Sequence, residues 1–238
     1  MTTPEGAVIS TAAHEALIIA HRGDPHRHRE NTVPAVLAGW ESGADLVEID
    51  VRRTRDGRPV ILHDPTLDRL WGSKIAVADR SLAEIQAEHP AIPDFEQLMA
   101  LSAAAGRGLM VDLPDPSAAE LAGEVVEAHD GFALSVFAGE VEGLLAVRRR
   151  WPQARIALSW SLPQLPEDDL LDQLKPEFFN PWWPLVDESL VALMRRRGCG
   201  ISTWTVDSPS NMARLIGLGV DALISNRPGL AFSVREAL

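Results

Sequence analysis

Cysteine, positive charge and long apolar runs are scarce in this chain of 238 residues, and each shortage excludes a class of protein. The single cysteine, Cys199, cannot form an intramolecular disulfide or a zinc site built from paired cysteines. The formal charge of −12 argues against a nucleic-acid or anionic-membrane binder, which normally carries a basic stripe. No apolar run is long enough to cross a bilayer, and residues 1–16 lack the basic start and apolar core of a signal peptide. We therefore expect a cytoplasmic protein without a nucleic-acid partner or an integral membrane segment.

Short apolar runs alternate with amphipathic segments along the chain, and this alternation predicts a parallel sheet covered by helices. Eight runs are typical of strands: Leu17–Ala20, Leu46–Val51, Gly108–Leu113, Phe132–Phe137, Arg155–Trp160, Glu177–Phe179, Gly200–Val206 and Val220–Ile224. The helix-like segments between them are Thr32–Ser42, Asp94–Ala105, Ser117–His129, Glu140–Arg150, Glu167–Leu174, Asp187–Arg197 and Ser210–Leu218. Eight such units favour a (β/α)8 TIM barrel, formed as one domain over residues 1–238, rather than a doubly wound open sheet.

Several boundaries of these elements carry the residues expected there. Asp94 and Ser117 stand where helix N-caps belong, because their side-chain oxygens can accept hydrogen bonds from the first turn. Gly198 and Gly219 stand where helix C-caps belong, since glycine readily adopts a positive φ.

One segment interrupts the alternation after the second strand. Residues Thr54–His63 contain the pair Asp56-Gly57, which suits a tight hairpin turn, followed by a short strand at Val60–Leu62. Such a hairpin would fold His63 and Asp64 back over the mouth of the barrel.

Barrel enzymes place their reacting groups where strands finish at the C-terminal face. In this chain those positions hold ionisable and aromatic side chains: His21 and Arg22, Glu48 and Asp50, His63 and Asp64, Asp112, and Trp204. They are the candidate site residues.

The acidic residues of this set predict a metal site. Glu48 and Asp50 are two positions apart on a strand, so both side chains point into the barrel, where Asp112 joins them from the next strand. Three carboxylates in a low-dielectric interior repel one another unless a proton or cation separates them. All-oxygen ligation suits Mg²⁺ or Ca²⁺ better than Zn²⁺. The alternative is that Glu48 pairs with Arg22 or Arg52 and that no metal binds.

The two histidines predict acid–base chemistry. His21 and His63 end separate strands, and an ordinary imidazole pKa of about 6.5 lets each hold or release a proton near neutrality. The fork-shaped guanidinium of Arg22 suits a pair of phosphate or carboxylate oxygens. The alternative is that both histidines are structural or lie on the surface.

These residues fall within ordered motifs that resemble the glycerophosphodiester phosphodiesterase family. The first motifs are His21-Arg22-Gly23, Glu30-Asn31-Thr32, Gly43-Ala44-Asp45 before Val47-Glu48-Ile49-Asp50-Val51, Thr54-Arg55-Asp56-Gly57 and Val60-Ile61-Leu62-His63-Asp64. The later ones are Ile92-Pro93, Trp204-Thr205-Val206-Asp207 and Gly219-Val220-Asp221-Ala222-Leu223-Ile224-Ser225-Asn226-Arg227-Pro228. The resemblance covers the chain from about Leu17 to Pro228.

The resemblance implies a metal-dependent barrel that cleaves small phosphodiesters to an alcohol and a phosphomonoester. Carried over position by position, it assigns a catalytic pair, two metal ligands, a phosphate-binding arginine and two mouth residues: His21 and His63, Glu48 and Asp50, Arg22, and Glu30 with Asn31.

Two positions depart from the family pattern of glutamate, any residue, then lysine on the third strand. Asp112 replaces the glutamate with a shorter carboxylate, as in the related sphingomyelinase D-like phospholipases, and Pro114 replaces the lysine that contacts the phosphoryl region. The loop Asp24–Arg29 is either a basic replacement for that lysine or a solvated surface loop. Its His26 and His28 imitate the HxH pair of zinc amidohydrolases, but they follow a proline rather than a strand.

Aromatic residues are candidates for an apolar wall. The chain has seven tryptophans and no tyrosine, and residues 178–184 bring two phenylalanines and two tryptophans together. With Trp204 they either hold glycerol, choline or an acyl chain at the mouth or serve only in packing.

The sequence therefore predicts a phosphodiesterase acting on glycerophosphodiesters with Mg²⁺ or Ca²⁺ bound. Attack by water and attack by a neighbouring substrate hydroxyl both remain open, as does the assignment of acid and base to the two histidines. The alternatives are a lysophospholipase D-like enzyme acting on a single-chain lipid and a phosphate-ligand binding protein that lost turnover with Pro114.

Overall fold

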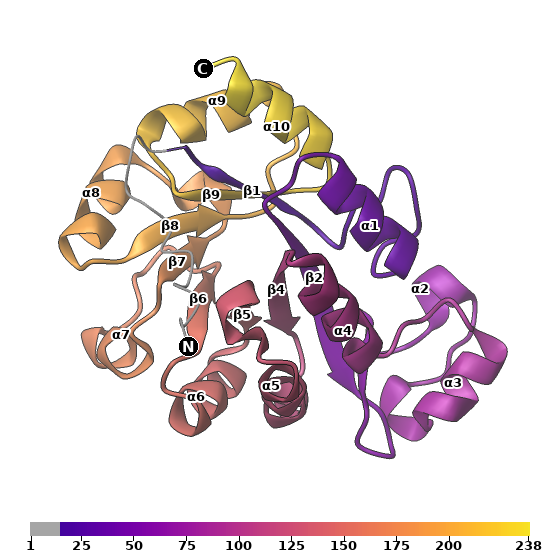
Figure 1. Cartoon of the computed structure of the whole chain (residues 1–238). Helices are drawn as coiled ribbons and strands as arrows, with labels where there is room; N and C mark the ends of the chain where they lie inside the picture. Colours follow the sequence, from indigo (N-terminus) through magenta and orange to yellow (C-terminus); the bar gives the residue numbers. More distant parts are fainter. Residues whose placement is uncertain (1–14) are drawn as a thin grey trace, which may run out of the picture.

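Eight parallel strands form a closed barrel in the computed structural model, which describes residues 15–238 (Figure 1). The barrel strands are β1 (Leu17–Ala20), β2 (Leu46–Arg53), β4 (Gly108–Leu113), β5 (Ser135–Gly139), β6 (Arg155–Trp160), β7 (Phe178–Pro181), β8 (Gly200–Thr203) and β9 (Ala222–Ser225). The ring closes because β1 pairs in parallel with both β2 and β9. The predicted TIM barrel is confirmed and the open sheet is excluded. The expectation for residues 1–16 falls almost entirely outside the described residues.

Helices surround the barrel, one after most strands (Figure 1). They are α1 (Val33–Glu41), α4 (Phe95–Ala105), α5 (Ala119–Ala128), α6 (Val141–Arg150), α7 (Asp168–Leu174), α8 (Glu188–Arg196), α9 (Pro209–Leu218) and α10 (Pro228–Glu236). A large apolar layer packs between helices and strands, and a smaller one, which includes Ile19, Met110 and Phe178, fills the barrel interior. No helix within residues 15–238 is both long and apolar enough to span a membrane.

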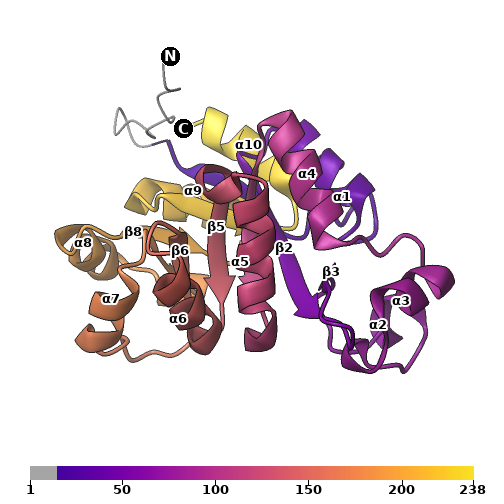
Figure 2. The ribbon, with the colours of Figure 1, turned by 60° about the horizontal axis from the view of Figure 1, so that its bottom comes forward.

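The insertion after β2 is larger than the predicted hairpin. β3 (Pro59–Ile61) pairs antiparallel with β2, as expected, and is followed by the short helices α2 (Asp68–Trp71) and α3 (Leu82–Glu88). This insertion has an apolar cluster of its own, which includes Leu67, Ile85 and Ile92. Figure 2 shows α2 and α3 at the end toward which the arrow of β2 points. The insertion therefore lies at the C-terminal face of the barrel.

The predicted boundaries are correct in most places. Asp94 caps α4 by accepting from the Glu96 amide, and Gly219 ends α9 with a φ of +84°. Gly198 directly follows Arg197, the C-cap residue of α8, and has a φ of +71°. The prediction for Ser117 is wrong, because its amide donates to Asp115 and α5 begins only at Ala119.

Several strand boundaries differ from the prediction, and those of β5, β7 and β8 differ most in their consequences. The segment 132–134 belongs to a 3-10 turn, so β5 begins at Ser135. β8 stops at Thr203 rather than Val206. β7 runs on to Pro181, which places Asn180 within the strand instead of in the loop after it.

Candidate active site

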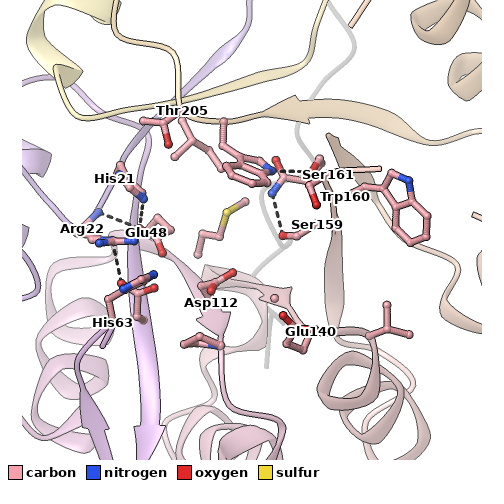
Figure 3. Close-up of a pocket in the computed structure, with 18 of the residues that line it drawn as sticks. His21, Arg22, Glu48, His63, Asp112, Glu140, Ser159, Trp160, Ser161 and Thr205 are labelled. Carbon is pink, nitrogen blue, oxygen red and sulfur yellow. Dashed lines mark hydrogen bonds and ion pairs between the residues drawn. The ribbon is translucent and has the colours of Figure 1, made fainter. Parts of the chain in front are cut away.

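A cavity of about 490 Å³ lies at the carboxyl ends of the barrel strands (Figure 3). Seven of the predicted site residues line it: His21, Arg22, Glu48, Asp50, His63, Asp112 and Trp204. Figure 3 shows the histidines with Arg22 and Glu48 on one side, Ser159 and Ser161 on the other, and Asp112 between them. Glu30 and Asn31 are not among the lining residues, but both contact residues that are.

Glu48, Asp50 and Asp112 converge as predicted. Asp50 on β2 pairs in register with Asp112 on β4, and one carboxylate oxygen from each of the three residues lies within 4.8 Å of the others. Burial, together with the neighbouring carboxylates, raises the pKa of Glu48 well above its usual value. Burial, and next the charge of Asp50, raises the pKa of Asp112 to about 7.

This cluster has the chemistry of a divalent-cation site. It offers hard oxygen ligands and carries more negative charge than the one guanidinium in contact with it, that of Arg22, can offset. Within residues 15–238, no ion pair joins Glu48 to an arginine side chain. Glu48 accepts from the backbone N–H of Arg22, at 2.9 Å, while Arg52 donates to the His63 carbonyl.

Arg22 is held between two carboxylates. Its Nε lies 3.1 Å from Asp50 Oδ2, and its Nη1 donates to Glu30 Oε1 at 2.9 Å. Asn31 donates from its amide to Asp50 Oδ2 at 2.7 Å and from its backbone N–H to the Arg22 carbonyl. Arg22 and Asn31 both have a φ of +57°, a left-handed backbone that is costly for residues with a Cβ. Glu30 and Asn31 thus position the guanidinium and one carboxylate.

Gly23 allows this turn to form. Its φ is +87°, and a Cβ there would lie 2.4 Å from the carbonyl carbon and oxygen of Ala35 in α1. We expect Gly23→Ala to lower the free energy of unfolding by at least about 2 kcal/mol, measured by denaturant titration. Gly57→Ala is the matched control, because Gly57 has a similar φ of +74° but a Cβ added there would meet no atom within 4 Å. A loss at Gly23 no larger than at Gly57 would contradict the steric argument.

His21 is fixed in one orientation. Its Nδ1 lies 2.7 Å from Asn226 Oδ1, and the Asn226 amide donates to Asp207 Oδ2 at 2.8 Å. Since the amide oxygen can only accept, the ring proton is on Nδ1, and Nε2, 4.0 Å from Glu48 Oε2, is left with a lone pair. Burial, and next the charge of Arg22, lowers the pKa of His21, so the ring is neutral near pH 7.

His63 belongs to a different network. Its Nδ1 lies 2.7 Å from Asp64 Oδ1, and Asp64 Oδ2 accepts from Arg69 Nε at 2.6 Å. Burial opposes ionisation of Asp64, but the hydrogen bonds from Arg69 and His63 outweigh it and hold its pKa below the usual value. Arg69 also donates to Glu30 at 2.6 Å, so α2 of the insertion is tied to the Arg22 pocket.

Three of these positioning residues were not predicted. Asp207 and Asn226 fall within motifs that were noted, and their places after β8 and β9 were the available signal. Arg69 lies in α2, and the sequence of that helix shows no pattern that points to the cavity.

The basic loop does not replace the missing lysine. Arg27 lies 3.5 Å from Glu41, and the Arg29 guanidinium stacks 4.3 Å from the Trp71 ring centre. Neither lines the cavity, and His26 and His28 are exposed outside it. Pro114 does line it, beside Glu140, so Arg22 is the only arginine or lysine among the described lining residues.

The predicted aromatic wall is only partly present. Trp204 lines the cavity and donates from Nε1 to the Asn180 carbonyl at 2.9 Å. Phe178 and Phe179 are buried in the two apolar layers instead, and Trp182 is 45 % exposed outside the cavity. Trp160, which the wall did not include, also lines the cavity.

Two histidines, an arginine and an acidic cluster at the mouth of a closed barrel suit the hydrolysis of phosphoric diesters. The model of the Glycerophosphoryl diester phosphodiesterase family matches residues 21–230. The chain therefore belongs to the glycerophosphodiester phosphodiesterase family.

Curated relatives agree with this membership, and solved structures share the fold. A glycerophosphodiester phosphodiesterase of Caldanaerobacter subterraneus subsp. tengcongensis is 26% identical over 231 residues, which cover 90% of this chain and 95% of the relative. One from Arabidopsis thaliana is 27% identical, covering 94% and 75%. The Thermotoga maritima enzyme has a TM-score of 0.80 at 19% identity, covering 94% and 100%. An Oleispira antarctica phosphodiesterase, solved with its product sn-glycerol-3-phosphate, has a TM-score of 0.81 at 24% identity, covering 92% and 96%.

Proposed function

We propose that this protein hydrolyses glycerophosphodiesters to an alcohol and glycerol phosphate, with Mg²⁺ or Ca²⁺ held by Glu48, Asp50 and Asp112. The observation that carries the proposal is the placement of His21 and His63 in one cavity with Arg22 and the acidic cluster. Family membership supports the same substrate class. We also propose that residues 1–238 form a single domain.

The three carboxylates would hold the cation, whose chemistry when bound is to neutralise phosphate charge and polarise the phosphorus centre. Arg22, fixed by Asp50 and Glu30, binds the phosphoryl oxygens. His21, neutral with its lone pair on Nε2, removes the proton from the attacking oxygen. His63, whose Nδ1 is held by the ionised Asp64, delivers a proton from its other nitrogen to the departing alkoxide.

The attacking oxygen comes either from water or from the glycerol hydroxyl next to the phosphate. The second route passes through a cyclic phosphodiester. Quenched-flow sampling followed by phosphorus NMR distinguishes them, because only the second route releases that species during turnover.

Asn226 should act as a positioning residue for His21. We expect Asn226→Ala to lower kcat/KM about 10-fold, because the lost hydrogen bond frees the ring to rotate and change tautomer. That bond also raises the pKa of His21, so its loss should shift the limb of the pH–rate profile that reports His21 to lower pH. Asn211→Ala, on α9 outside the cavity, is the control. An unshifted profile would remove Asn226 from this role.

An assay with glycerophosphocholine tests the proposal. The protein should release choline from it, and the activity should depend on added Mg²⁺ or Ca²⁺. Failure to turn over any glycerophosphodiester, with phosphate compounds still bound, would leave the binding-protein alternative in place.

A second candidate, lysophospholipase D-like activity, is favoured by one observation. An apolar groove of about 390 Å³, lined by residues that include Leu165, Leu185 and Leu190, shares Trp160 and Leu162 with the cavity. An acyl chain of a lysophospholipid could occupy it while the headgroup enters the cavity. Turnover of lysophosphatidylcholine that falls in Leu165→Asp, with glycerophosphocholine turnover unchanged, would establish this activity.

A further inference from the structure

The wall of the cavity opposite the histidines carries a row of neutral polar side chains. Ser159 on β6 pairs in register with Asn180 on β7. On the other side of β7, Phe178 pairs in register with Gly200 of β8. Asn180 and Ser202 each lie two residues beyond that pair, so they stand at the same level of the two strands. Ser159 and Asn180 line the cavity, whereas Ser202 is fully buried and does not.

Asn180 has an amide atom without a partner among the described residues. The side chain is almost fully buried, its Nδ2 donates to Ser159 Oγ at 3.2 Å, and its Oδ1 accepts nothing. Exchanging the two amide atoms would leave the nitrogen unpartnered instead. Either orientation therefore leaves one buried polar atom at the cavity wall, which is unfavourable unless a ligand pairs with it.

The surroundings of Asn180 fit a neutral hydroxyl rather than a phosphate. The only arginine among the described lining residues, Arg22, lies on the opposite side with the histidines, and the acidic Glu140 also lines the cavity. An anion would find no charge partner on this wall. A hydroxyl can donate to an amide oxygen and accept from a serine hydroxyl at once, and the indole of Trp204 supplies an apolar surface for adjoining carbons.

We propose that Asn180, assisted by Ser159, binds a hydroxyl group on the alcohol part of the substrate and thereby selects hydroxyl-bearing phosphodiesters. The inference rests on the proposed function and names the determinant of its substrate class. The hydroxyl belongs either to the glycerol that stays on the phosphate or to the leaving alcohol. Both present the same chemistry, and the experiment separates them.

Calorimetric binding with Mg²⁺ or Ca²⁺ present forms the first arm, using sn-glycerol 3-phosphate and n-propyl phosphate, which lacks the hydroxyls. The second arm compares kcat/KM for glycerophosphoglycerol with that for the analogue whose leaving alcohol is n-propanol. In one of the two arms, Asn180→Ala should lower the affinity or the kcat/KM for the hydroxyl-bearing compound about 10-fold. The same quantity for the hydroxyl-free compound should change by no more than about 2-fold. A change in the first arm assigns the retained glycerol, and a change in the second assigns the leaving alcohol.

Ser202→Ala is the matched control, because it removes a hydroxyl from the same row without touching the cavity, and both arms should stay unchanged. Ser159→Ala is the second variant should Asn180→Ala not fold, and it should reduce the same selectivity. Equal losses on both members of each pair, or no loss, would overturn the inference and make the amide a structural feature. Absence of turnover by the wild type would refute the proposed function alone, since the binding arm needs no turnover.

Discussion

The single variants His21→Ala and His63→Ala should each have a kcat for glycerophosphocholine at least about 100-fold below that of the wild type. His21→Ala removes the Nε2 lone pair, which is kept available because Asn226, itself held by Asp207, binds the Nδ1 side of the ring. His63→Ala removes the proton donor that Asp64 orients. Neither residue contributes much to the apolar layers, so thermal unfolding should change little.

His26→Ala is the matched control for both variants. It removes an imidazole from the same stretch of chain as His21, but His26 is exposed and lies outside the cavity, so kcat should stay at the wild-type value. A near-normal rate in the His21 or His63 variant would remove that histidine from the mechanism.

An activated leaving group separates the two roles. p-Nitrophenolate leaves without a proton, so a glycerophospho-p-nitrophenyl substrate should recover most of the rate in His63→Ala and little in His21→Ala. The opposite result would exchange the acid and the base.

The barrel and its acidic cluster could be predicted because short-range patterns determine them. The alternation of apolar runs with amphipathic segments predicts parallel strands and helices, and the two-residue spacing of Glu48 and Asp50 places both inside the barrel. Register then brings Asp112 beside Asp50, as expected for the carboxyl ends of neighbouring strands.

The rest depends on contacts between distant segments. Arg69 reaches Glu30 across 39 positions of sequence, and Asn226 reaches His21 across 205. Sequence spacing cannot predict such pairs, because they depend on how the insertion and the last strand close over the mouth. The same reason explains why the sequence left two interpretations of the basic loop open, whose arginines pair with Glu41 and stack on Trp71 in the structure.

A small error in a strand boundary also had a large consequence. The apolar run Glu177–Phe179 ends one residue before Asn180, so the prediction left that side chain in a loop. In the structure β7 continues through Pro181, and strand alternation turns Asn180 into the barrel interior with Phe178. Asn180, the polar residue directly after the apolar run, was therefore the residue that showed where β7 meets the cavity.

Removing divalent cations should lower turnover by at least about 100-fold, and adding Mg²⁺ or Ca²⁺ should restore it. The reason lies in the cluster of Glu48, Asp50 and Asp112, whose mutual repulsion and burial leave a site that a cation stabilises. Asp50→Asn should lose both turnover and the rise in melting temperature that the cation produces. Glu140→Gln, which removes a lining carboxylate outside the cluster, should keep the cation-dependent rise in melting temperature. Full turnover after exhaustive chelation would refute the metal assignment.

Cation affinity should also depend on pH, with a direction set by Asp112. Burial and Asp50 raise its pKa to about 7, so below pH 7 the carboxyl is mostly protonated and a cation must displace that proton. The Asp112 proton alone should therefore lower the apparent affinity about 10-fold for each pH unit below 7, and Glu48, whose pKa is raised well above its usual value, should make the dependence on pH steeper wherever it is also protonated. Calorimetric titration with Ca²⁺ between pH 5.5 and 8 measures this dependence, in about half-unit steps. In Asp112→Asn the contribution of that proton should disappear, leaving a weaker site with a shallower slope. An affinity independent of pH in the wild type would mean that the cation does not bind to these carboxylates.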